Sequence, residues 1–248
     1  FYKDLKLTAN VGMQYLGISA SDLTNPYYGD AAGVGRIEKS QTNYLSLTAN
    51  QLLEYNKQID LHTLRVLAGH ETNFIQNATL AGQKNYLAIG DNLEWSNAIQ
   101  MGYMSSSTSA ASLESYLATA NYNYDERYFV NGSYRADGSS RFAKNNRWGH
   151  FGSVGAAWMV SNEDFMSNVN LLKNLKLRAS WGVLGNQGID LYLYQDQYSV
   201  ENVDGKVAYV LTYKGNPNLT WERTMTYDVG LEFDLGKYLS AEFDYYYK

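Results

Sequence analysis

Strict alternation of apolar and polar residues is the feature that most limits how this chain can fold. In residues 5–15 every odd position is Leu, Ala, Val, Met or Tyr, and every even position is polar or Gly. The same alternation occurs in residues 174–183, 225–235 and 239–247. Successive side chains of a β-strand point to opposite faces of the sheet, so each segment has one apolar and one polar face. The chain is therefore predicted to be all-β and antiparallel.

Nine strands of roughly ten residues are predicted, about the length that crosses a bilayer at a tilt of about 45°. The weaker ones cover 45–55, 59–68, 116–124, 128–134 and 154–160. A bulge is expected between Leu61 and Leu64, because the phase of the alternation shifts there. Trp148, Trp158 and Trp221 lie near strand ends, where an amphipathic ring can sit at head-group level.

The connections between these strands differ in length. Long loops are predicted at 17–41, 71–112, 137–149 and 185–220. Tight turns are predicted at Asn56-Lys57, Asp125-Glu126 and Gly236-Lys237, and a short helical turn is predicted at 162–171 within the connection 161–173. Long loops on one side and short periplasmic turns on the other are typical of outer-membrane barrels. An antiparallel barrel closes only with an even number of strands, so nine strands predict a fragment of a larger transmembrane β-barrel.

Charged residues in the middle of the strands favour a water-filled interior over a packed soluble core. They lie on the polar face, and Lys6, Arg178, Asp228, Glu232 and Asp244 are expected to line the lumen. Soluble antiparallel sheets also alternate, so a long-stranded soluble sandwich or a β-sheet adhesin stays open as the alternative.

Composition excludes several classes of protein. The net charge of −5 argues against a nucleic-acid partner, which normally requires a basic face. The mean hydropathy is −0.41, and no apolar run approaches the ~18 residues of a membrane helix. The chain has no Cys, and its three His have no metal-ligand spacing. No enzyme activity, no cofactor and no metal site are predicted.

Three longer motifs are more specific than the alternation. They are YFVNGSYRADGSSRF at 128–142, RWGHFGSVGAAW at 147–158 and LKLRASWGVLGNQG at 175–188, with supporting matches at 67–71, 215–222 and 242–246. Together they resemble the barrel signatures of the SusC/RagA-like family of TonB-dependent, or TonB-linked, outer-membrane transporters, from about residue 42 to 248. The chain differs from the family at Gly152, where a Pro is often found.

The resemblance implies a 22-stranded barrel with a plug, of which residues 1–248 would be part of the barrel domain, without the plug domain or the Ton box. It implies the import of oligosaccharides or peptides across the outer membrane of a Gram-negative bacterium of the Bacteroidetes type. The implied partners are a SusD-like surface lipoprotein, TonB through an N-terminal region, outer-membrane lipid and the substrate. Two other functions stay open, a soluble or surface glycan-binding or adhesin module and a passive porin.

Candidate substrate contacts fall in the loops and on the lumen face. They are Arg135, Asp137, Arg141, Arg147, Asn186, Gln187, Arg178, Asp228 and Glu232. The loop arginines have an alternative role as a salt-bridged loop base. The segments 186–188 and 216–218 have turn chemistry as their alternative, because Asn and Gly favour turn conformations.

Overall fold

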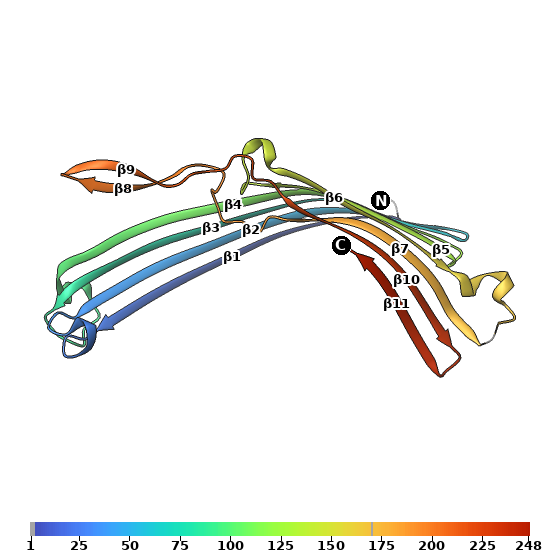
Figure 1. The fold of residues 1–248 in the computed structure, drawn as a ribbon, viewed down its shortest axis with the longest axis horizontal. Coiled ribbons are helices and arrows are strands. Elements are labelled where there is room, and N and C mark those ends of the chain that lie inside the picture. Colours follow the sequence, from blue (N-terminus) through green and yellow to red (C-terminus); the bar gives the residue numbers. More distant parts are fainter. Residues whose placement is uncertain (1–2, 170) are drawn as a thin grey trace. The chain divides into compact units, whose positions relative to one another are not determined.

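A computed structural model describes residues 3–169 and 171–248 of the chain. Nine strands form one sheet in the order β1-β2-β3-β4-β5-β6-β7-β10-β11, and β8 and β9 form a separate pair (Figure 1). The sheet strands are β1 (Leu5–Thr24), β2 (Arg36–Ile59), β3 (His62–Leu87), β4 (Ala98–Tyr124), β5 (Tyr128–Ser139), β6 (Trp148–Met159), β7 (Leu172–Asn186), β10 (Glu222–Leu235) and β11 (Leu239–Tyr247). The prediction of an all-β antiparallel sheet is confirmed.

The chain divides into two compact units. The first contains Phe1–Asn10, Ala49–Thr72 and Leu113–Lys248, and the second contains Val11–Thr48 and Asn73–Ser112. The boundary between the units crosses β1–β4, so part of each of these strands belongs to the first unit and the rest to the second.

The first four strands are much longer than predicted. They have 20, 24, 26 and 27 residues, so most of the predicted loops 17–41 and 71–112 is strand. The true connections are residues 25–35 and 88–97, which contain the 3-10 turns η1 (Gly29–Ala31) and η2 (Trp95–Asn97). The prediction failed because Ser, Thr, Asn and Gly replace the apolar residues there. A strand with water on both faces carries no alternation.

Two of the three predicted tight turns are confirmed. Asp125 and Glu126 both have positive φ, 52° and 51°, and the Arg127 amide donates to the Tyr124 carbonyl at 3.0 Å across this turn, while Gly236 has a φ of 57°. Asn56-Lys57 is wrong, because both residues lie inside β2 and the chain turns at Asp60, whose φ is 51°. The phase shift between Leu61 and Leu64 therefore reflects this turn and not a bulge.

The remaining connections hold short elements. The predicted loop 185–220 contains the hairpin of β8 (Gln197–Val203) and β9 (Lys206–Tyr213). The predicted loop 137–149 is shorter, since β5 runs to Ser139, and it contains η3 (Lys144–Asn146). The helical turn predicted at 162–171 is found as η4 (Val160–Asn162) and η5 (Asp164–Met166), while residue 170 lies outside the described residues.

A small core fixes the loop ends of the first unit. Phe142, Phe151 and Trp221 pack together, with Leu113, Val183, Ile189 and Leu219 against them. Trp221 is only 7% exposed and donates its indole N–H to the Arg147 carbonyl at 2.8 Å. Its predicted place at head-group level is therefore wrong. Among the described residues no helix is both long and apolar enough to cross a bilayer.

Candidate functional site

The sheet of the first unit has one apolar and one polar face. The β7–β10 register pairs Trp181 with Tyr227 on the apolar face and Lys176 with Glu232 on the polar face. The apolar face continues across five strands in register, through Tyr122, Val130, Ala156, Ala179 and Val229. The alternation predicted from the sequence is confirmed in these strands.

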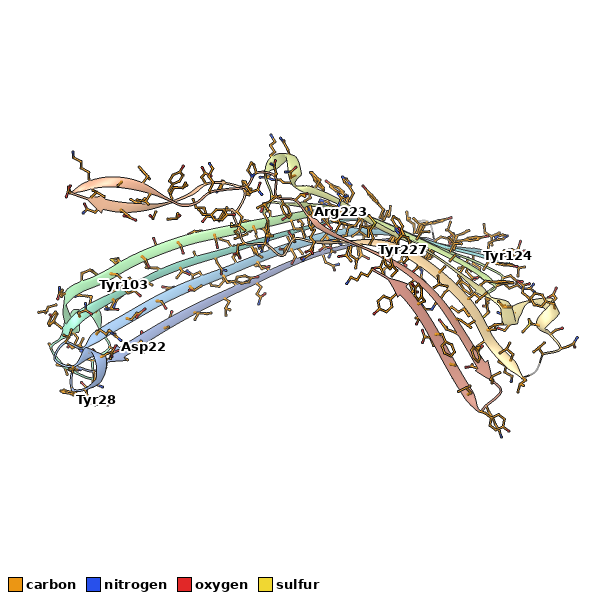
Figure 2. All side chains as sticks on the ribbon, in the orientation of Figure 1. Asp22, Tyr28, Tyr103, Tyr124, Arg223 and Tyr227 are labelled. Carbon is orange, nitrogen blue, oxygen red and sulfur yellow. The ribbon has the colours of Figure 1, made fainter. Side chains whose placement is uncertain are left out.

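Aromatic rings form a lower row on the apolar face, next to the tight turns. His62 lies 4.8 Å from Tyr124 between ring centroids, Tyr124 lies 6.3 Å from Tyr128, and Tyr128 lies 6.5 Å from Trp158. Tyr124, the last residue of β4, is labelled in Figure 2. Rings with polar edges on an otherwise apolar surface are typical of a membrane–water interface.

A second, upper row lies on the same face further along the strands. His70 lies 4.8 Å from Tyr116, which lies 6.0 Å from Trp148, and Tyr134 donates to or accepts from His150 Nδ1 at 2.7 Å. Tyr116 and Tyr124 are eight positions apart on β4. That spacing is about 27 Å along a strand, or roughly 19–22 Å across a bilayer at a tilt of about 35–45°. The two rows therefore border an apolar band whose height is close to the ~25 Å band of outer-membrane barrels.

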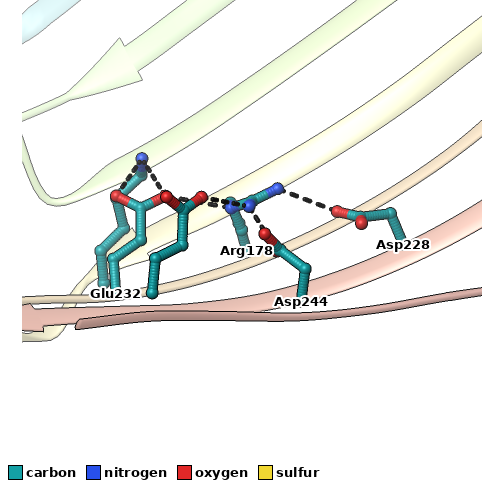
Figure 3. Close-up of polar contacts among 6 residues, drawn as sticks. Arg178, Asp228, Glu232 and Asp244 are labelled. Atoms are coloured by element: carbon teal, nitrogen blue, oxygen red, sulfur yellow. Dashed lines mark hydrogen bonds and ion pairs between the residues drawn. The ribbon is translucent and has the colours of Figure 1, made fainter.

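The polar face carries an ionic cluster at β7, β10 and β11. Arg178 is its centre, 2.9 Å from Asp228, 2.8 Å from Glu242 and in close contact with Asp244 (Figure 3). Its Nε is 3.0 Å from Glu232 Oε1 but lacks hydrogen-bond geometry, and Lys176 lies 3.1 Å from the same carboxylate. The ionic cluster consists of Lys176, Arg178, Asp228, Glu232, Glu242 and Asp244.

Gly230 makes room for the guanidinium. It pairs with Arg178 on one side and Asp244 on the other. A Cβ at Gly230 would lie 2.6 Å from Arg178 Nε and 2.5 Å from Asp244 Oδ1, closer than these atoms can approach. Two cations face four carboxylates, so the cluster leaves an excess of two negative charges on the polar face. Such a surface attracts cationic groups.

Arg135 and Asp137 line a hollow higher on the polar face. Arg135 donates to Asp137 at 2.7 Å and to Ser115 at 2.9 Å, and both partners are buried. The hollow has a volume of about 350 Å³ and is bounded by Phe151, Ser153 and the upper end of β7. These two candidate residues therefore lie together, as an ion pair at its wall.

The other loop candidates bond mainly to backbone groups, and Asn186 alone among them also bonds to a carboxylate. Arg141 donates to the Ile189 carbonyl, and Arg147 Nε donates to the Phe142 carbonyl at 3.3 Å. Asn186 accepts from the Gly188 amide at 2.9 Å and donates to Glu222 at 3.0 Å. The Gln187 carbonyl accepts from Ile189 at 2.7 Å. Arg141 and Arg147 thus occupy the loop base, where they bond to carbonyls and not to the carboxylates of a salt bridge. Asn186 and Gln187 take part in the turn that was the alternative for segment 186–188.

Sequence reasoning missed parts of the polar face. Lys176 and Glu242 share the parity of the other charged residues but were not predicted as site residues, and Lys6 lies apart on β1. A further hollow of about 430 Å³ is lined mainly by polar side chains and the ring of Phe129; its polar lining includes Thr63, Arg65, Asn121, Asn123 and Asn131. The Asn123 Oδ1 is buried and has no hydrogen-bond partner among the residues that the structure describes. The alternation assigns these positions to the polar face, but which of them become neighbours depends on how the strands pair.

A second polar cluster joins two turns beside the lower aromatic row. Glu163 accepts from Tyr128 at 2.6 Å and from the Trp158 indole at 2.9 Å, and it pairs with Arg127 at 3.3 Å. The hydrogen bonds from Tyr128 and Trp158 hold the pKa of Glu163 below its ordinary value. The turn after β4 is thus tied to the connection between β6 and β7.

Comparison with known proteins places this sheet in a family. The family model described as "TonB dependent receptor-like, beta-barrel" matches residues 1–248. TonB-dependent receptor SusC of Bacteroides thetaiotaomicron is 32% identical over 243 residues, 94% of this chain and 24% of SusC. TonB-dependent receptor P3 of Formosa agariphila is 34% identical over 217 residues, 84% of this chain and 21% of P3.

Solved structures agree. The structure of the RagAB peptide transporter matches with a TM-score of 0.90 at 26% identity, covering 98% of this chain and 28% of the matched chain. The chain thus spans about a quarter of the length of these relatives. Sequence, family and fold agree: the chain belongs to the TonB-dependent receptors of the SusC/RagA kind and is part of their β-barrel.

Proposed function

We propose that this chain forms barrel wall and extracellular loops of an outer-membrane importer of nutrients that is driven through TonB. The observation that carries the proposal is the pair of aromatic rows on the apolar face, opposite a polar face with charges. A soluble sandwich would bury its apolar face, whereas here Tyr116, Tyr134 and Val154 are about half exposed. Lipid on one side and water on the other satisfies both faces.

The substrate class is proposed as oligosaccharides or peptides. One matched structure is that of a peptide transporter, which supports the second of these classes. The lumen candidates are Arg135 and Asp137 at the upper hollow and Arg178, Asp228 and Glu232 in the ionic cluster. The excess negative charge of the cluster favours substrates or plug segments with cationic groups over anionic ones.

A SusD-like lipoprotein is proposed as the partner at the outer mouth, and TonB as the partner of an N-terminal region. The proposed location is the outer membrane of a Gram-negative bacterium. The hairpin of β8 and β9 is suited to an outer contact, because Tyr198, Val200, Tyr209 and Leu211 are exposed on one of its faces.

Uptake in cells tests the proposal. The whole protein would be expressed in an outer membrane, and entry of labelled oligosaccharides and peptides would be measured with and without TonB. We expect uptake that stops when TonB is removed. Uptake that persists without TonB would indicate a passive porin. A protein recovered from the soluble fraction without detergent would indicate the glycan-binding or adhesin alternative.

A further inference from the structure

The part of β4 that belongs to the second unit has an edge without a neighbouring strand. β5 pairs with β4 over residues 113–124 and ends at Ser139. On its other side β4 lies beside β3, where a Cβ at Gly102 would be 3.2 Å from the Gln83 carbonyl oxygen. In the described part of the chain no strand pairs with residues 99–108 on the side away from β3. We call this side of residues 99–108 the free edge.

A strand edge of this length presents a row of main-chain donors and acceptors. Alternate residues of a strand direct both their N–H and their C=O to the same edge, so about half of the residues 99–108 serve the free edge. All of them are exposed, and Tyr103 among them is labelled in Figure 2. We propose that the free edge captures extended peptides, which add to the sheet as a further strand. The proposal rests on the import function above and selects peptides as its substrate class.

The sequence of the free edge contains nothing that opposes such pairing. Proteins commonly protect an open edge with Lys, with other charged residues or with Pro, and residues 95–113 contain none of these. The ribbon of β8 and β9 also has open edges among the described residues, but Glu201, Asp204 and Lys206 lie in or beside its turn. A long edge without charge or Pro is a site for strand addition.

The side chains of the free edge suit peptides of many sequences. In strand addition the main chain supplies affinity, and pockets for the side chains supply specificity. Residues 105–108 are Ser, Ser, Ser and Thr, which are too small to form the walls of such pockets. Ile99, Met101 and Met104 are 82%, 56% and 63% exposed, and Met adapts its shape to different apolar groups. A ligand class with one backbone and variable side chains fits this edge better than a single partner protein does.

Two further observations favour peptides over oligosaccharides. An extended peptide repeats its N–H and C=O pair every two residues, about 6.6 Å, as the free edge does, and an oligosaccharide does not. One matched structure is that of a peptide transporter. On the way from the lower aromatic row, β4 reaches residue 108 only after it has passed Tyr116 of the upper row. The free edge therefore follows the apolar band along the strand, where water admits a peptide.

Peptide binding to the whole purified protein tests the proposal. The probe is a fluorescein-labelled peptide of alternating Thr and Val, and its fluorescence anisotropy measures binding in detergent. Ser106→Pro and Ser107→Pro each remove one N–H, and because adjacent N–H groups point to opposite edges, one of the two alters the free edge and the other the ladder with β3. We expect the variant that alters the free edge to weaken binding at least about tenfold. Ser199→Pro on the exposed strand β8 is the matched control and should bind as the unchanged protein does.

A change in the peptide tests the main chain without any variant, so the test stays open if the Pro variants do not fold. The same peptide with every amide N-methylated keeps its side chains and loses its donors, and we expect it not to bind. Equal binding of the methylated peptide would overturn strand addition. Unchanged binding by both Pro variants would overturn the free edge as the site. Dimers of the unchanged protein that dissociate with either Pro substitution in native mass spectrometry would assign the edge to a second copy and overturn the peptide.

Uptake separates this proposal from the import function. Uptake that depends on TonB, in a protein that does not bind the peptide, would refute peptide capture and leave import standing. Peptide binding that depends on the free edge, in a protein without TonB-dependent uptake of any substrate, would refute the import function and leave the binding site standing. Supporting both, peptide uptake should fall at low peptide concentration in the variant that alters the free edge and recover at high concentration.

Discussion

Replacing Arg178 by Met removes the guanidinium at the centre of the ionic cluster and keeps most of its volume. Four carboxylates then face each other with Lys176 as their only cation in the cluster. Exposed ion pairs contribute about 0–1 kcal/mol, whereas breaking a buried pair costs about 3–5 kcal/mol. The Arg178 side chain is 28% exposed, between these limits. We expect the free energy of unfolding to fall by about 2–3 kcal/mol.

Urea unfolding of the whole protein in lipid vesicles measures this change. Lys6→Met is the matched control, because Lys6 is an exposed cation on the polar face of β1 without an ion-pair partner among the described residues. It should change the free energy of unfolding by less than about 0.5 kcal/mol. Raising the salt concentration should shrink the Arg178 effect but not abolish it, since partly buried pairs are screened less.

Gly230→Ala provides an independent check of the geometry. Its Cβ would displace the guanidinium, and we expect a loss of about 1–3 kcal/mol from overpacking. In the Arg178→Met background the clash with the guanidinium is absent and only the contact with Asp244 Oδ1 remains, so the same substitution should cost less. An Arg178→Met protein within about 0.5 kcal/mol of the unchanged one, or additive effects of the two substitutions, would refute the reasoning.

Three other parts of the chain give predictions. Hydrogen bonds from Lys214 and from the Gly215 amide, the latter at 2.8 Å, lower the pKa of Asp196 at the base of the β8–β9 hairpin. The stability that these bonds give the hairpin is present above the ordinary pKa of 3.8 and is lost as pH falls through the lowered pKa. Protease cleavage of the hairpin should therefore rise only in acid, and Asp196→Asn should raise the cleavage at pH 7. Trp221→Ala should cost about 3–5 kcal/mol and expose residues 140–147 to protease, and full stability would contradict the packing of Trp221 on Phe142 and Phe151. Glu163→Gln should loosen the connection between β6 and β7 in hydrogen exchange, whereas Asp164→Asn, which alters only an exposed contact of Arg127, should not.

The sequence predicted the alternating segments of the sheet, but not the extensions of β1–β4 or the hairpin of β8 and β9. Lipid requires apolar side chains at every second position, and residues such as Val11 and Met13 therefore reveal their strand. Beyond Tyr15 the alternation ends, and Ser19 and Ser21 look like loop residues although they continue β1. The hairpin of β8 and β9 was missed for a related reason, since nothing obliges a short exposed ribbon to alternate strictly.

The sequence indicated which charged residues belong to the candidate site, but not which of them contact one another. Parity assigns Arg178, Asp228 and Asp244 to one face, but their contact depends on β10 pairing with β7 across 35 intervening residues, 187–221. The role of Gly230 follows only from that register. The acceptor of Arg141 is a backbone carbonyl of Ile189, and every residue has a carbonyl, so no sequence pattern could indicate it.

The spacing of the two aromatic rows has a consequence for the membrane itself. A band of roughly 19–22 Å is shorter than the ~30 Å hydrocarbon core of an average bilayer and closer to the thinner outer membrane. In a thick bilayer the lipids around β3–β6 would have to compress or the strands would have to stand more upright, at a cost of fractions of a kcal/mol for each ångström of mismatch. Lipids with short acyl chains should therefore be the better medium for reconstitution, and they should gather around this wall in a mixed membrane.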